Sequence, residues 1–226
     1  MKFLTLLKKE LQESGLLMIL VLLVFTILAD LIIRDFSLSG GDGYRYYVSH
    51  GYYRLFHDSY ANGVGTILTF SSIVLGLTLG VLHFWMPSFT RTWSFFIHRS
   101  VPRMTILSSK LLCAVLAFGI CLGIPWIWAH GYLNHVQTTG FPPNPRVLWE
   151  GWLFIGWGFA VYLGTALIAL STARWYTTRL FGAILAFISF LWLMTLSSLW
   201  AALGLLVITL ILLLAQLTHT FSRKSF

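Results

Sequence analysis

The chain has 226 residues, of which 58% are hydrophobic and only 10% are charged, and its mean hydropathy is +0.81. Soluble globular proteins carry about 25% charged residues, so the composition excludes an ordinary soluble domain and indicates a protein that lies in lipid. A net charge of +8 would suggest a nucleic-acid partner in a soluble chain. Here membrane topology accounts for the charge, and we expect no nucleic acid among the partners.

The predicted elements are all helical. Residues 1–14 alternate charged and apolar side chains at helical spacing, which predicts an amphipathic helix lying in the membrane interface. Apolar stretches follow whose lengths suit the crossing of a bilayer, at 15–34, 63–86, 106–129, 149–170, 180–197 and 199–218. A turn near Ser197 and Ser198 divides the last two, because one helix over both would overshoot the membrane. The sequence therefore predicts an all-α integral membrane protein with six transmembrane helices in a single transmembrane domain, 1–226.

The basic residues give the orientation. With six crossings, eleven of the fifteen Lys and Arg residues fall on one side of the membrane, and the positive-inside rule makes that side cytoplasmic. Both termini are then cytoplasmic. We expect a multi-pass protein of the cell membrane, namely the cytoplasmic membrane of a prokaryote.

The sequence offers little for catalysis. It has no His-Glu-x-x-His zinc motif and no P-loop to hold ATP phosphates, and no span carries paired acids. We expect no catalytic, cofactor-binding or metal-binding residues, and the two cysteines, Cys113 and Cys121, to be packing residues. An enzymatic alternative would have to use side chains on the predicted outer side, namely His50, His57, His130, His135, Asp58 and Glu150.

Two pairs of glycines have the Gly-x-x-x-Gly spacing that lets membrane helices approach closely. Gly76 and Gly80 lie in the second predicted span, and Gly119 and Gly123 lie in the third. The pairs predict close helix contacts, either within the chain or with another subunit.

The loop over 87–105, after the second span, combines aromatic and basic residues on the predicted cytoplasmic side. Such residues are typical anchors of protein contacts, although an interfacial helix on anionic lipid would have a similar composition. The residues concerned are Trp93, Phe95, Phe96, His98, Arg99 and Arg103.

This order of parts resembles the membrane subunit of type-2 ABC exporters. The resemblance rests on the amino-terminal Lys-Lys-Glu-Leu-Gln-Glu, the six spans and the basic aromatic loop. Within the loop, Ser100-Val101-Pro102-Arg103, followed by Ile106 and Lys110, looks like the family segment in which Pro-Val-Ser-Arg precedes an apolar residue and a lysine. The chain departs from the family pattern in having Thr90, Thr92 and Ser94 where many members have a glutamate.

The resemblance implies a permease, not an enzyme, that works with separate ATP-binding-cassette ATPase subunits and a second permease chain, identical or similar. ATP and Mg would bind in the partner, with no cofactor in this chain. The 87–105 loop would be the coupling helix, with Arg99 and Arg103 contacting acidic ATPase residues and Trp93, Phe95 and Phe96 as the apolar anchor. The alternatives are an ATP-independent six-span transporter or channel, or a membrane-embedded enzyme.

Overall fold

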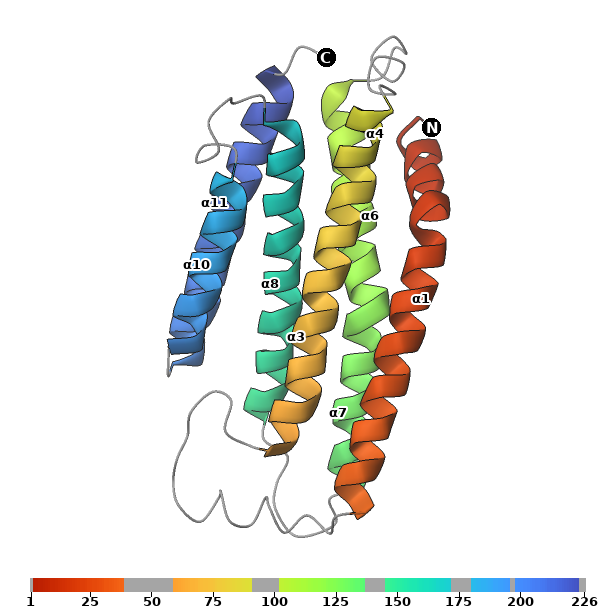
Figure 1. The fold of residues 1–226 in the computed structure, drawn as a ribbon, viewed down its shortest axis with the longest axis vertical. Coiled ribbons are helices and arrows are strands. Elements are labelled where there is room, and N and C mark those ends of the chain that lie inside the picture. The colour runs from red at the N-terminus through yellow and green to blue at the C-terminus, as the bar shows by residue number, and fades with distance from the viewer. Residues whose placement is uncertain are drawn as a thin grey trace.

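The computed structural model describes residues 2–38, 59–90, 102–136, 145–171, 180–195 and 198–223. Over these ranges the chain forms six helical segments, with no β-strand among them, and the helices run alternately up and down a single bundle (Figure 1). The all-α prediction is confirmed for this part of the chain. The start of the first helix and the end of the last lie at the same end of the bundle, as an even number of crossings requires.

The first helix, α1 (Lys2–Leu38), contains 37 residues without a break. The expected interfacial helix over 1–14 is therefore not a separate element, because its residues form the first turns of the same helix that contains the 15–34 span. Its length is about 55 Å at the usual helical rise. The continuity has a packing reason, since Glu10 and Ser14 are buried in line with Val21, Phe25 and Ala29 further along the same helix.

The second and third helical segments each contain a π-helical turn. The second consists of α3 (Ser59–Gly80), the π-turn η1 (Val81–Trp85) and α4 (Met86–Phe89). A π-turn adds a residue to one helical turn and is frequent at functional sites.

The third segment consists of α6 (Arg103–Phe118), the π-turn η2 (Gly119–Gly123) and α7 (Ile124–Val136). Helical structure therefore covers both ends of the predicted 87–105 loop.

The fourth helix, α8 (Pro145–Leu170), is the centre of the bundle. It packs along α3 on one side and along α10 (Phe181–Thr195) and α11 (Leu199–Arg223) on the other. Most of its length is buried, whereas α1 and α11 are mostly exposed. Trp157 of α8 attaches α10 through two contacts. Its ring stacks on Phe190 with centroids 3.9 Å apart, and its Nε1 donates a hydrogen bond to the Ala186 carbonyl at 3.0 Å.

Five of the helices described by the structure are long and apolar enough to cross a membrane. The exception is α10, whose 15 residues span about 22 Å, less than the roughly 30 Å of a hydrocarbon core. Within the predicted 180–197 span, the helix that the structure describes is therefore shorter than a full crossing. Large apolar side chains remain exposed on the outside of the bundle, among them Leu16, Ile19, Trp192, Trp200 and Ile208. Lipid is the environment that suits such a surface, so the chain is a multi-pass helical membrane protein.

Candidate functional site

A buried ion pair joins α1 to α6. Lys110 Nζ donates a hydrogen bond to Glu10 Oε1 at 2.7 Å, and each of the two residues is only 3% exposed. Away from water an unpaired carboxylate or ammonium is costly, so each charge depends on the other. The contact brings together two segments that are separated by about a hundred residues of sequence.

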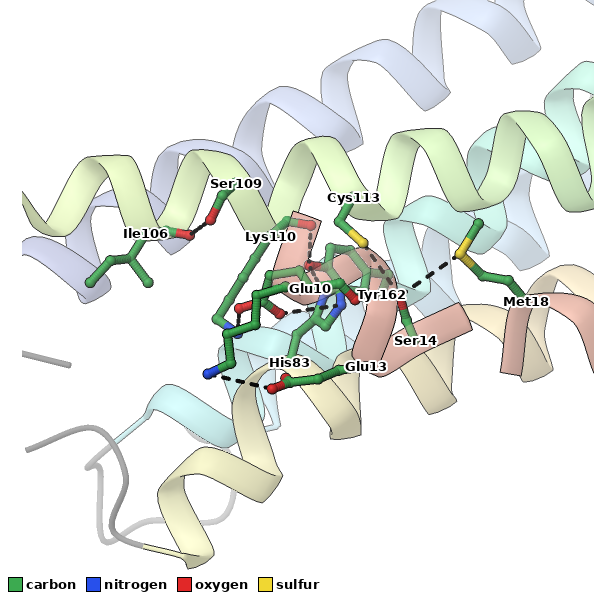
Figure 2. Close-up of polar contacts among 11 residues, drawn as sticks. Glu10, Glu13, Ser14, Met18, His83, Ile106, Ser109, Lys110, Cys113 and Tyr162 are labelled. Carbon is green, nitrogen blue, oxygen red and sulfur yellow. Dashed lines mark hydrogen bonds and ion pairs between the residues drawn. The ribbon is translucent and has the colours of Figure 1, made fainter. Parts of the chain in front are cut away.

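Two aromatic side chains extend this pair to the second helical segment and to α8 (Figure 2). His83, in η1, directs Nε2 toward Glu10 Oε2 at 3.8 Å, and its Nδ1 lies 3.0 Å from the Tyr162 hydroxyl of α8. The hydroxyl also lies 3.4 Å from the Lys110 carbonyl oxygen, to which it can donate. Tyr162 is fully buried and His83 is 3% exposed.

Ser14 completes what we call the polar cluster, defined as Glu10, Ser14, His83, Lys110 and Tyr162. One turn along α1 from Glu10, its hydroxyl donates to the Glu10 carbonyl at 2.7 Å. The same hydroxyl lies 3.5 Å from Cys113 Sγ. The polar cluster thus connects α1, η1, α6 and α8 at the end of the bundle where α1 begins (Figures 1 and 2).

Local structure explains how His83 reaches this position. The π-turn Val81–Trp85 interrupts the α-helical register of the second segment, and both His83 and Phe84 are buried within it. Directly before the π-turn, Gly80 lets α8 approach closely, since a Cβ at position 80 would lie 2.7 Å from the Thr165 Cβ. The close contact puts His83 within reach of Tyr162, one turn earlier on α8.

The four predicted packing glycines have different surroundings. A Cβ at Gly76 would collide with the Gly158 carbonyl oxygen of α8, so Gly76 and Gly80 line a close contact between α3 and α8. A Cβ at Gly123 would lie 2.9 Å from the Trp152 ring, whereas a Cβ at Gly119 would meet nothing within 4 Å.

Most of the predicted coupling residues lie outside the described residues, namely Trp93, Phe95, Phe96, His98 and Arg99. Arg103 is described. It is the first residue of α6, and its Nη1 donates to the Ser222 carbonyl near the end of α11 at 3.3 Å. The start of the third helical segment is thereby tied to the end of the last.

The outer histidines are only partly within the described structure. His50 and His57 lie outside it, and the ring of His130 stacks on Trp126 with centroids 6.3 Å apart. Among the residues that the structure describes, no group of three or more His, Cys, Asp and Glu side chains is arranged to hold a metal ion.

Sequence reasoning missed the polar cluster. It assigned Glu10 to an interfacial helix and counted Lys110 among the cytoplasmic basic residues. A signal was present, because Glu10 and Ser14 fall on the helical stripe that continues through Val21, Phe25 and Ala29. A carboxylate in line with the apolar face of a span needs a buried partner, and Lys110, beside Leu111 and Leu112, was the available cation.

The cluster contains a carboxylate, an ammonium and an imidazole that contact one another in a site shielded from water. Such groups can hold helices together and can bind or release a proton. No protein-family model, no curated protein and no solved structure matches the chain at a significant level.

Proposed function

We propose that the chain is the permease subunit of an ATP-binding-cassette transporter, an exporter in which ATP is hydrolysed by separate subunits and a second permease chain completes the pathway. The observation that carries the proposal is that both helices leading to the basic aromatic loop enter the same polar cluster. A loop that receives force from a partner needs rigid attachment to the helices that must move.

The attachment is close to the loop on both sides. His83 lies within about two turns of the end of α4 at Phe89, and Lys110 lies about two turns after the start of α6 at Arg103. Glu10 contacts both, through the 2.7 Å bond to Lys110 and the 3.8 Å approach to His83. A displacement of the loop would therefore reach α1 and α8 as well as its own two helices.

The proposed mechanism is rigid-body movement of the helices. Closure of the ATPase dimer would push the 87–105 loops, and the linked helices would tilt and change access to a path at the interface of the two permease chains. Such coupling requires different contacts in the two states. A lipid-like or amphiphilic cargo suits this chain better than an ion, because only 10% of its residues are charged and few of them are available to line a path.

The test is charge reversal in the loop. We expect Arg99→Glu/Arg103→Glu to lose the ATP-binding subunit during gentle purification, since two favourable contacts with acidic residues become repulsive. The matched control is Lys8→Glu/Lys9→Glu, which makes the same charge change on α1 near the same end of the bundle. Retention of the partner and of ATP-driven transport by the loop variant would contradict the proposal.

A second function is favoured by a different observation. Ionisable residues buried inside a membrane bundle commonly mark ion or proton pathways, and the Glu10, His83 and Lys110 side chains contact one another here. An ATP-independent transporter would use them directly. That alternative predicts transport in proteoliposomes that contain this chain alone.

A further inference from the structure

The polar cluster has one carboxylate for two groups that can carry positive charge. Among the residues that the structure describes, the titratable groups that face His83 are Glu10 of α1, Lys110 of α6 and Tyr162 of α8, with Cys113 one turn further along α6. With a neutral imidazole, the charges of Glu10 and Lys110 cancel. Because Lys110 already bonds to Glu10 at 2.7 Å, a charged imidazole would bring the cluster to a net charge of +1 without a second anion.

The hydrogen bonds at Tyr162 assign the tautomer. Its hydroxyl has a single proton and two acceptors within reach, His83 Nδ1 at 3.0 Å and the Lys110 carbonyl at 3.4 Å. The shorter contact is the stronger hydrogen bond, so Tyr162 donates to an unprotonated Nδ1. The proton of the neutral ring is then on Nε2, directed at Glu10 Oε2.

The distance between His83 Nε2 and Glu10 Oε2 excludes both a direct hydrogen bond and a bridging water. At 3.8 Å it is longer than a hydrogen bond, and it is too short for a bridging water, which would need about 2.8 Å to each atom. Within the described part of the chain, Nε2 has no hydrogen-bond partner. The imidazole is therefore fixed through Nδ1 alone while α1 is in place.

A second proton on the imidazole would disturb this arrangement. Nδ1 would become a donor, so the Tyr162 proton would have to turn to the longer contact with the Lys110 carbonyl. The added charge would lie beside Lys110 in a site that is 3% exposed, where an unneutralised charge is costly. Separation of α1 from the cluster would relieve both effects by admitting water.

We propose that His83 is a proton-binding site whose occupancy excludes the docking of α1. While α1 is docked, His83 is neutral and accepts the Tyr162 hydrogen bond. When α1 separates, water reaches His83 and the imidazole takes one proton from it, and redocking returns that proton to water. The inference goes beyond the proposed transport function, because it depends only on the polar cluster.

The linkage has a definite sign. An imidazole in contact with water binds a proton below about pH 6.5, so acid favours the separated form. Each pH unit below that value raises the ratio of separated to docked protein by about tenfold. Above about pH 6.5, protonation of His83 no longer opposes the docking of α1.

The chain carries its own reporter of docking. Cys113 is fully buried, with Sγ 3.5 Å from Ser14 Oγ of α1, so separation of α1 uncovers it. Since the chain has two cysteines, a Cys121→Ser variant leaves Cys113 as the single thiol. The experiment measures the rate at which dithiodipyridine, a small thiol reagent that works in acid, modifies Cys113 in the full-length protein in lipid nanodiscs between about pH 8 and about pH 5.

A His83→Gln variant in the same background supplies the pH response of the reagent itself, because glutamine does not titrate. We expect the ratio of the two rates to rise by about tenfold per pH unit below about 6.5. Equal pH responses in the two proteins would overturn the proposal.

A Tyr162→Phe variant in the Cys121→Ser background tests the same point if the glutamine variant fails to fold. It removes the donor to the neutral ring and so weakens the docked form. Its labelling should be faster than that of the parent at each pH, while the rise still begins below about pH 6.5. A Tyr162→Phe profile identical to that of the parent would also overturn the proposal.

Discussion

At the scale of single residues, the protein depends on a pair of charges that water does not reach. Glu10 and Lys110 gain from their 2.7 Å hydrogen bond, but most of that gain repays the loss of hydration. Single and double replacements of the pair therefore have different expected effects on stability. Removal of one partner leaves an uncompensated buried charge, whereas replacement of both partners by apolar residues leaves none.

We expect Glu10→Gln to destabilise the purified protein by about 3–5 kcal/mol, because the buried Lys110 would lose its ion-pair partner. The neighbouring Glu13→Gln is the matched control. Glu13 pairs with Lys9 at 3.4 Å on the exposed side of the same helix, and its loss should cost less than about 0.5 kcal/mol. Unfolding in detergent, followed by helical circular dichroism, compares the two variants directly.

The double variant Glu10→Leu/Lys110→Met extends this comparison. It removes both charges and keeps the volume of the side chains, so we expect it to recover most of the stability that Glu10→Gln loses. Equal stability of Glu10→Gln and Glu13→Gln, or a double variant as unstable as Glu10→Gln, would contradict the buried pair as the structure describes it.

Sequence patterns could not identify this pair from local composition. Hydropathy averages over neighbours, so Glu10 is grouped with Lys8, Lys9 and Glu13, and the four together resemble a solvated helix end. The partner lies a hundred residues away. Only the helical phase of Glu10, on the stripe of Val21 and Phe25, distinguishes it from its exposed neighbours.

At the scale of elements, the close approach of α3 and α8 depends on glycine. A methyl group at Gly76 would collide with the carbonyl oxygen of Gly158, which is backbone and cannot rotate away. The sequence predicted a close contact from the Gly-x-x-x-Gly spacing and left the partner helix open. The partner could not be predicted because glycine spacing identifies a face and gives no information about the helix opposite it.

Gly76→Ala should therefore destabilise the bundle, since α3 and α8 must separate to admit the Cβ. Gly119→Ala is the matched control, because a Cβ there meets nothing within 4 Å, and it should be neutral or stabilising by up to about 1 kcal/mol. Thermal unfolding in one detergent would measure both. A Gly76→Ala protein as stable as Gly119→Ala would show that the two helices do not approach this closely.

The helices themselves were predictable to different degrees. Continuous apolar stretches predicted the long spans because hydropathy over about 20 residues is a direct requirement of the bilayer. The unbroken α1 was not predicted, because its first turns are charged on the exposed side and only Glu10 and Ser14 indicate burial. The 180–197 stretch was expected to form a full span, because no charged residue lies between Arg179 and His219, whereas α10 contains 15 residues.

At the scale of the whole molecule, the two ends of the described chain lie at one end of the bundle (Figure 1). The excess of Lys and Arg on that side predicts that it faces the cytoplasm. A green fluorescent protein fused to the carboxyl terminus should fluoresce, since it folds in the cytoplasm. Alkaline phosphatase inserted after residue 140 should be active, since it folds only outside, and the opposite pattern would contradict the orientation.

The most direct test of the central claim, that this chain is the permease of an ATP-driven transporter, is the composition of the complex in native membranes. Gentle extraction of the tagged protein, followed by quantitative mass spectrometry, would measure which chains are present in fixed proportion to it. We expect a second permease chain and an ATPase subunit with a P-loop, present in equal numbers. Purification of this chain alone, as an oligomer that transports without ATP, would contradict it.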